Sequence, residues 1–230
     1  MDAAVDEVQE YYALTRKAFD LLAPIYHWMT LPLRRVRPLV VEFSQVQPGA
    51  KVLDVATGTG EQAFAFARSS CDVIGVDLTD SMLQRARQRN REGKVKFEVG
   101  DATHLRFATK SFDITCISFA LHDMPPFIRQ KVISEMIRVT KLDGRLIVVD
   151  YDLPQNKLGR ILVRWFVSLY EGKYYDQFIV SDMGSLLESN GIEVTDQLPI
   201  LAGAGRIWNG RVSSTKHTTP ASSRFLHHFC

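Results

Sequence analysis

Cysteine is scarce in this 230-residue chain, and its scarcity excludes two common ways of stabilising a small protein. The three cysteines, Cys71, Cys116 and Cys230, are an odd number and stand at no spacing typical of metal ligands. We therefore expect neither a disulfide framework nor a metal site, and we predict a reducing, cytoplasmic setting. The length fits one domain with small additions, which can bury roughly 70% of its unfolded surface without such links.

Long hydrophobic runs are also missing. No apolar stretch approaches the roughly 20 residues that a transmembrane helix needs, and the opening MDAAVDEVQE is acidic where a signal peptide would be basic. Neither sign of charge dominates: the net charge is +2, and four basic residues after Ala202, with no acidic counterpart, account for this excess. The sequence therefore predicts no transmembrane segment and no nucleic-acid partner.

What is present is an alternation of short apolar runs with helical segments. Such runs, rich in Val and Ile, are typical of buried strands in a parallel sheet. Right-handed crossovers between them predict a doubly wound, Rossmann-like α/β fold. The expected strands are residues 51–56, 72–77, 94–99, 112–120 and 145–150. The expected helices between them begin at Gly60, Ser81 and Pro126.

Residues 1–44 precede this alternation and are predicted to be helical. Residues 5–20 and 21–44 both have helical patterns. Prolines are expected to break the second stretch into pieces, because a proline inside a helix removes a hydrogen bond and clashes with the preceding turn. These prolines are Pro24, Pro32 and Pro38.

The α/β domain is predicted to span residues 45–210. After its last parallel strand, residues 157–170 and 182–190 have helical spacing, and two further strands with a turn near Pro199 follow. Residues 211–230 are rich in Ser, Thr and His and poor in aliphatic side chains, so we predict a flexible tail.

The segment most informative about a ligand is VLDVATGTG, residues 52–60. A buried strand ends there, a turn with glycines follows and a helix begins, which is where open α/β sheets bind ligands. Gly58, Gly60 and Ala63 satisfy the G-x-G-x-x-G/A pattern of dinucleotide sites. Asp54 opposes a dinucleotide, because its carboxylate would repel a pyrophosphate but suits a ligand bearing an ammonium group.

Two further carboxylates end the next two strands. Asp77 is placed to accept hydrogen bonds from ribose hydroxyls, and Asp101, followed by Ala102, to accept the exocyclic amine of an adenine. Leu78 and Met82 are placed to cover one face of that base. Asp77 also has a structural explanation as a cap of the next helix, and Asp54 has one as a buried turn acid bonded by backbone amides.

These residues resemble the class I S-adenosylmethionine-dependent methyltransferases, and most of all the subgroup of ubiquinone/menaquinone biosynthesis and small-molecule methyltransferases. The likeness covers roughly residues 12–208 and includes VIGVDLTDSMLQRAR, VKFEVGDATHLRFATKSFDITCISFALHDM and RVTKLDGRLIVVDY. AFDLLAPIYHW is similar to the opening of that subgroup, so the resemblance makes residues 1–44 a lid. It also implies a seven-stranded sheet whose last strand is antiparallel, and S-adenosyl-L-methionine as cofactor.

The resemblance assigns roles by position. Ser118 and Phe119 would line the methionine side near the acceptor, and Tyr26 would close the lid over the cofactor carboxylate. The sequence departs from the subgroup at Ala56, where a glycine is usual, at His27 and at residues 121–124. The full set predicted to bind the cofactor is Tyr26, Asp54, Ala56, Gly58, Gly60, Asp77, Leu78, Met82, Asp101, Ala102, Ser118 and Phe119.

His122 is the candidate catalytic base. It follows the fourth strand beside Asp123, and histidine titrates near neutral pH. A structural His–Asp pair is the competing interpretation. Methyl transfer needs a base only when the acceptor must lose a proton early, because the cofactor carries the reactive carbon and its leaving group.

The acceptor is predicted to be a small molecule. An aromatic set between the fifth strand and the next helix suggests a flat or lipophilic one, although such a set is more often core. It comprises Trp165, Phe166, Tyr170, Tyr174, Tyr175 and Phe178. Two alternatives stay open: a nicotinamide-dependent oxidoreductase, and a catalytically silent methyltransferase fold that binds a membrane or partner through its tail or residues 157–170.

Overall fold

The computed structural model describes residues 2–154, 159 and 174–213. Its centre is a seven-stranded sheet with the order β3-β2-β1-β4-β5-β7-β6. The first five strands are parallel, and β7 lies antiparallel between β5 and β6. The predicted doubly wound fold with an antiparallel last strand is thus confirmed. The strands are β1 Lys51–Val55, β2 Asp72–Asp77, β3 Val95–Val99, β4 Phe112–Ser118, β5 Thr140–Tyr151, β6 Ile192–Ile200 and β7 Gly205–Val212.

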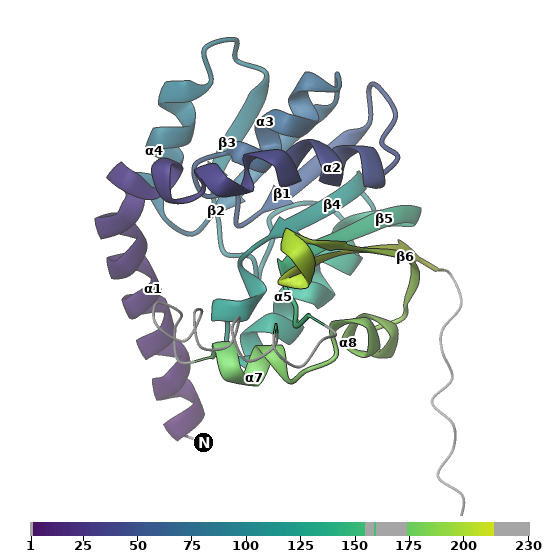
Figure 1. Ribbon diagram of the computed structural model, residues 1–230. Helices are drawn as coiled ribbons and strands as arrows, with labels where there is room; N and C mark the ends of the chain where they lie inside the picture. Colours follow the sequence, from purple (N-terminus) through teal and green to yellow (C-terminus); the bar gives the residue numbers. More distant parts are fainter. Residues whose placement is uncertain (1, 155–158, 160–173, 214–230) are drawn as a thin grey trace, which may run out of the picture.

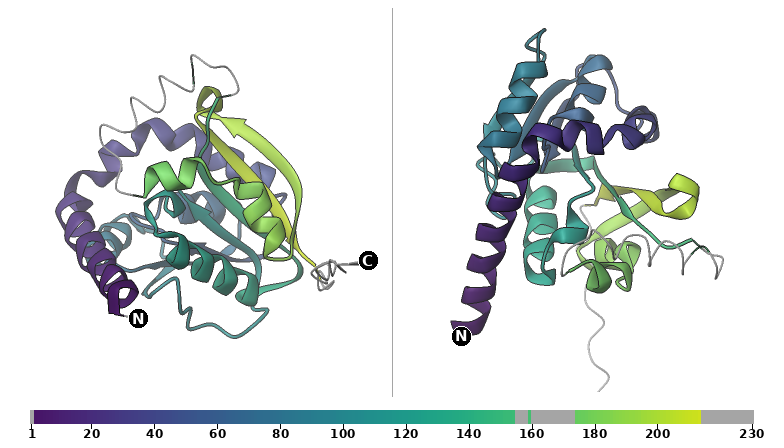
Figure 2. Two further views of the ribbon diagram at one scale, coloured as in Figure 1. Left: turned by 90° about the horizontal axis from the view of Figure 1, so that it is seen from below. Right: turned by 60° about the vertical axis from the view of Figure 1, so that its left-hand side comes forward.

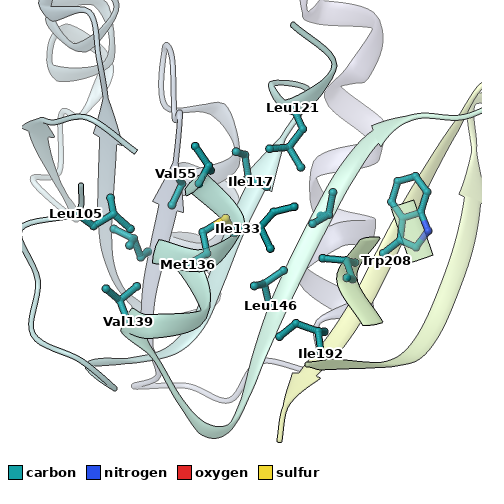
Figure 3. Close-up of a cluster of buried hydrophobic side chains, with 14 of the residues drawn as sticks. Val55, Leu105, Ile117, Leu121, Ile133, Met136, Val139, Leu146, Ile192 and Trp208 are labelled. Atoms are coloured by element: carbon teal, nitrogen blue, oxygen red, sulfur yellow. The ribbon is translucent and has the colours of Figure 1, made fainter. Parts of the chain in front are cut away.

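Helices cover both faces of this sheet (Figures 1 and 2). Successive residues of a strand point to opposite faces, so Leu146 and Val148 of β5 join one core while Ile147 and Val149 join the other. The first core packs against α5 and α8 (Figure 3), and the second against α2 and α3. The helices are α1 Asp2–Met29, α2 Val36–Phe43, α3 Glu61–Arg68, α4 Asp80–Arg89, α5 Pro126–Val139, α7 Tyr175–Ile179 and α8 Met183–Ser189, with short 3-10 turns η1 Leu31–Arg35, η2 Leu121–Asp123 and η3 Leu201–Gly203.

The prolines of the N-terminal segment act differently from the prediction. Pro24 lies inside α1, which continues to Met29. The break comes instead at η1, whose first turn holds Pro32, and Pro38 sits in the first turn of α2. A proline in a first turn removes no helical hydrogen bond. The predicted break at Pro24 is therefore wrong, and α1 is one long helix at the edge of the molecule (Figure 1).

Two boundaries also differ from the prediction. β5 begins at Thr140, directly after α5, because Thr140 pairs with Phe112 before the register shifts. β7 continues to Val212, which pairs with Ile192, so the first two residues of the predicted tail belong to the sheet. Residues 214–230 of the predicted tail, and the predicted helix at 157–170 apart from residue 159, lie outside the described residues. Within the described ranges, no helix is long and apolar enough to cross a membrane.

Candidate functional site

Two adjoining hollows lie where the parallel strands end, under α1. The larger encloses about 760 Å³ and the smaller about 390 Å³, counting the parts open to solvent. Tyr26, Ala56, Gly58 and Phe119 line both, so the two form one continuous site. Of the predicted residues, the larger hollow also contains Asp77, Leu78, Met82, Asp101 and Ala102. The smaller hollow also contains Asp54 and Ser118.

Asp77 ties the glycine turn to the end of β2. Its Oδ2 accepts a hydrogen bond from the Gly58 amide at 2.7 Å, and its Oδ1 accepts from the amide and hydroxyl of Thr79 at 3.0 and 2.6 Å. Burial raises the pKa of Asp77, and these hydrogen bonds oppose that rise. A carboxylate has about four acceptor positions, so capacity remains for a ligand hydroxyl. Asp77 therefore has a structural role and can still face a ribose.

Asp101 is held in a similar way beyond β3. Its Oδ1 accepts from the amide and hydroxyl of Thr103 at 2.8 and 2.7 Å. The Thr103 hydroxyl also lies 3.1 Å from the hydroxyl of Tyr12, which comes from α1. The adenine position predicted beside Asp101 is therefore bounded by α1 as well as by the strand ends.

The smaller hollow brings together a buried anion and a buried cation. Asp54 at the end of β1 is 1% exposed, and the Thr57 hydroxyl donates to its Oδ2 at 2.5 Å. Burial raises the pKa of Asp54 to about 6, while the hydrogen bond from Thr57 and the charge of Arg37 oppose the rise. Gln62 from α3 lines the same hollow, and its buried Oε1 has no hydrogen-bond partner among the described residues.

Arg37 was not predicted from the sequence. It lies in α2, is 8% exposed and has its guanidinium 5.7 Å from the ring of Phe119. Within the described ranges its guanidinium takes part in no ion pair or hydrogen bond, although buried charges are normally paired. No motif marks it, because only the fold brings α2 to the end of β1. The site can therefore receive a ligand carrying both a carboxylate, at Arg37, and an ammonium, at Asp54 and Gln62.

Two residues of the site have a backbone conformation that glycine prefers. Ala56 has φ 52° and Phe119 has φ 51°, and both directly follow a strand where they line the hollows. A non-glycine residue in this left-handed region costs roughly 1–2 kcal/mol. Such strain is found preferentially at functional sites. Ala56 thus adopts a left-handed conformation at the position where the resemblance leads us to expect glycine.

We expect Ala56→Gly to raise the free energy of unfolding by about 1 kcal/mol, because relief of the left-handed strain exceeds the added entropy of the unfolded chain. Urea denaturation measures the change. Ala102→Gly is the control: it also loses a methyl group in the larger hollow, but Ala102 has no positive φ, so its stability should fall. A loss of stability in both variants would contradict the strain at Ala56.

Gly60 is the one predicted cofactor residue that lines neither hollow. It is the N-cap of α3 with φ 83°, and a Cβ there would stand 2.8 Å from the ring of Phe97. Glycine is therefore needed at position 60 for the left-handed conformation of the turn and for the close approach of the Phe97 ring. Direct cofactor contact by Gly60 remains a prediction.

His122 also lies outside both hollows. It is 4% exposed, and its Nδ1 lies 2.7 Å from Oδ1 of Asp150 at the end of β5. Its Nε2 is 3.5 Å from Oδ2 of Asp123, which does line the larger hollow. This position favours the structural His–Asp pair, with Asp150 rather than Asp123 as the close partner. The catalytic role of His122 stays a prediction.

The wall that α1 contributes was predicted only through Tyr26. Tyr11, Tyr12, Thr15 and Phe19 line the larger hollow as well. Of the aromatic set predicted to roof an acceptor pocket, Tyr174, Tyr175 and Phe178 are buried and line neither hollow. The other members, Trp165, Phe166 and Tyr170, lie outside the described residues.

Comparison with known proteins adds to this geometry. The family model described as a methyltransferase domain matches residues 52–144. An uncharacterised methyltransferase of Synechocystis is 32% identical over 79% of this chain and 84% of its own length. A demethylmenaquinone methyltransferase of Paenarthrobacter aurescens is 38% identical over 63% of this chain, which spans little more than half (57%) of that relative.

Solved structures show the same fold. The magnesium protoporphyrin IX methyltransferase of Synechocystis, determined with bound S-adenosylhomocysteine, superposes with a TM-score of 0.63 at 22% identity over 78% of this chain and 83% of its own. The sheet order, the strand-end site and the extended match to a relative agree with one another. The chain belongs to the class I S-adenosylmethionine-dependent methyltransferases, close to those of ubiquinone and menaquinone biosynthesis.

Proposed function

We propose that this protein transfers the methyl group of S-adenosylmethionine to a small lipophilic acceptor. The observation that carries the proposal is that a buried cation, Arg37, and a buried anion, Asp54, line the smaller hollow without forming an ion pair, beside the Oε1 of Gln62 that has no partner among the described residues. S-adenosylmethionine ends in an α-carboxylate and an α-ammonium, so these three groups fit that end. The bound cofactor would supply a methyl carbon with a good leaving group.

The larger hollow fits the other end of the same ligand. Asp77 would hold the ribose, Asp101 would accept the adenine amine, and Met82 and Ala102 would line the base. Each side chain is already fixed by the fold, so little conformational entropy is lost on binding. Holding both reactants in line contributes roughly 7–11 kcal/mol of barrier lowering in well-oriented reactions. This alignment, with exclusion of water by α1, is the main work proposed for the chain.

The acceptor proposed is aromatic or lipophilic because aromatic side chains line the site. Tyr11, Tyr12 and Phe19 come from α1, and Phe119 follows β4. The relative named for demethylmenaquinone makes a reduced short-chain naphthoquinone the first acceptor to test. The sequence 121–124 departs from the subgroup, so the screen should extend to other flat acceptors.

Neither alternative function is favoured. A nicotinamide dinucleotide would bring its pyrophosphate to the glycine turn beside the Asp54 carboxylate, which repels it. A catalytically silent fold would bind the cofactor through the same Arg37 and Asp54, so only an assay of methyl transfer separates it from the enzyme. The cytoplasmic setting and the lack of a nucleic-acid partner, inferred from composition, remain predictions, as does the division at residues 44 and 210.

Calorimetric titration tests the cofactor, and transfer of a labelled methyl group tests the activity. We expect saturable binding of S-adenosylmethionine and S-adenosylhomocysteine and none of NADH. Binding of NADH with no adenosyl binding would replace the proposal with the oxidoreductase. Adenosyl binding without methyl transfer to any acceptor in the screen would instead favour the silent fold.

The pKa of Asp54 predicts how cofactor affinity depends on pH. An ammonium pairs with the ionised carboxylate, and in the free protein this carboxyl has a pKa of about 6. Below pH 6 the group must lose its proton on binding, so affinity should fall by up to tenfold per pH unit, while above pH 7 it should be level. Calorimetry at pH 5 to 7.5 measures this.

5′-Methylthioadenosine is the matched ligand for that experiment. It keeps adenine, ribose and sulfur but has neither ammonium nor carboxylate. Its affinity should stay level across the same range. An equal fall for both ligands would assign the proton to Asp77, whose pKa burial also raises.

Substitution of His122 separates its two roles. We expect His122→Gln to lower the free energy of unfolding by about 2–3 kcal/mol, because it removes a buried hydrogen bond to the Asp150 carboxylate. Adenosyl affinity should change little. A fall in kcat of roughly 10²–10⁴, with the stability unchanged, would instead restore the predicted base.

A further inference from the structure

The outer side of α1 carries an apolar stripe that no other described part of the chain covers. Leu14, Leu21, Ile25 and Trp28 recur at helical spacing and are all exposed, Leu21 by 80% and Trp28 by 70%. Met29 and Leu31 continue the stripe into η1. From Leu14 to Met29 it extends roughly 22 Å along the helix. We call these six residues the α1 stripe.

The opposite surfaces of α1 are occupied. Tyr12, Phe19 and Tyr26 point to the two hollows, and the Asp20 carboxylate accepts a hydrogen bond from Ser81 of α4 at 2.5 Å. The helix is therefore held in one rotation about its axis. The α1 stripe faces outward because of that anchoring, at the edge of the molecule where Figures 1 and 2 place the helix.

The charge around the stripe is mainly positive, although Glu10 stands one helical turn before Leu14. Between residues 11 and 41 the only acidic residue is Asp20, which Ser81 engages. The basic residues of this segment are Arg16, Lys17, Arg34, Arg35 and Arg37. All but Arg37 are exposed. Arg34 and Arg35 form no ion pair within the described part of the chain and directly follow the end of the stripe.

We propose that the α1 stripe and the flanking basic residues dock this protein on an anionic lipid surface. An exposed apolar face with a tryptophan, bordered by Lys and Arg, is the pattern of helices that lie in a membrane interface. A second copy of the chain is disfavoured as the occupant, because it would bring the same cations against each other. Anionic headgroups complement them, at about 1 kcal/mol for each basic residue.

The docking stands independently of the proposed function, since it needs no cofactor. If the acceptor is lipophilic, as proposed, docking also affects how the acceptor reaches the larger hollow. The helix that would lie on the lipid also supplies Tyr11, Tyr12 and Phe19 to the larger hollow. A lipophilic acceptor would then pass from the lipid to the hollow along α1 without crossing bulk water.

Vesicle flotation of the full chain tests the proposal. We expect the protein to float with phosphatidylcholine vesicles containing phosphatidylglycerol and to stay behind with phosphatidylcholine alone. The double variant Leu21→Glu with Trp28→Glu should lose at least tenfold in bound fraction. Arg34→Gln and Arg35→Gln should each weaken binding about fivefold. Val180→Glu is the matched control, because Val180 is 72% exposed but lies beyond α7.

Three results would overturn the docking. The first is that the protein does not float with anionic vesicles. The second is that Val180→Glu loses as much of its bound fraction as the double variant. The third is that the unsubstituted protein is a dimer in analytical ultracentrifugation and that the double variant is a monomer. The last result would assign the stripe to a second copy. Affinity for S-adenosylhomocysteine serves as the folding control: a double variant that keeps it has lost the surface and not the fold. Absence of adenosyl binding in every variant would count against the proposed function alone.

Discussion

Arg37→Gln is expected to weaken S-adenosylhomocysteine binding by about 100-fold and to leave 5′-methylthioadenosine binding unchanged. The guanidinium is buried beside Phe119 and takes part in no ion pair within the described residues, so a ligand carboxylate would be its main partner. Hydrogen bonds to a charged group contribute about 1.5–3 kcal/mol each, and arginine can form two with one carboxylate. The second ligand lacks that carboxylate, and calorimetry compares the two.

Arg34→Gln is the matched control, because Arg34 is an exposed arginine of η1 and lines neither hollow. Its adenosyl affinities should equal those of the unsubstituted protein. Stability gives a second readout for Arg37: removing an unpaired buried cation should not lower the melting temperature. Equal weakening of both ligands by Arg37→Gln, or a large fall in melting temperature, would mean that Arg37 maintains the fold and does not hold the carboxylate.

Asp77→Ala should weaken both ligands, by about 100- to 1000-fold. Both contain the ribose that Asp77 is proposed to hold through a charge-assisted hydrogen bond. The substitution also releases the amides of Gly58 and Thr79, which shape the turn. The two variants therefore differ in pattern: Arg37→Gln discriminates between the ligands and Asp77→Ala does not.

Asp80→Ala provides the comparison for Asp77. Its carboxylate stands three residues later, is exposed and pairs with Arg87 on the surface of α4. We expect this variant to bind both ligands normally, because exposed ion pairs contribute little. If Asp77→Ala bound both ligands as tightly as Asp80→Ala, the Asp77 carboxylate would have only a structural role, and the sequence allowed such a role as a helix cap.

The strand ends were predictable because they depend on local pattern. Val52, Leu53 and Val55 are apolar and fully buried, and the Asp54 carboxylate between them belongs to a strand that ends at a glycine turn. Parallel strands bring their carboxyl ends to one edge of a sheet, so Asp54, Asp77 and Asp101 had to lie near each other. The resemblance to methyltransferases then supplied the antiparallel last strand.

The N-terminal segment was harder to predict. Helical spacing marked residues 5–44, but whether Pro24 ends a helix depends on what holds the chain on either side. Here Asp20 before the proline accepts a hydrogen bond from Ser81, and the Tyr26 ring after it lies close to Gly58, 3.6 Å from the position of an ideal Cβ there. Because the chain is held on both sides, the helix stays continuous through Pro24. These are contacts between residues far apart in the chain, which periodicity does not report.

By itself the sequence determined that a sheet forms, the succession of strands and helices along the chain, and the acids that end the strands, because burial imposes a residue pattern on each element. Tertiary structure alone decided that Arg37 and Gln62 meet Asp54, since three separate elements must converge there. It also decided that His122 pairs with Asp150 away from the hollows, and that one face of α1 is left exposed. Each of these depends on how elements pack, and packing is a property of the assembled chain.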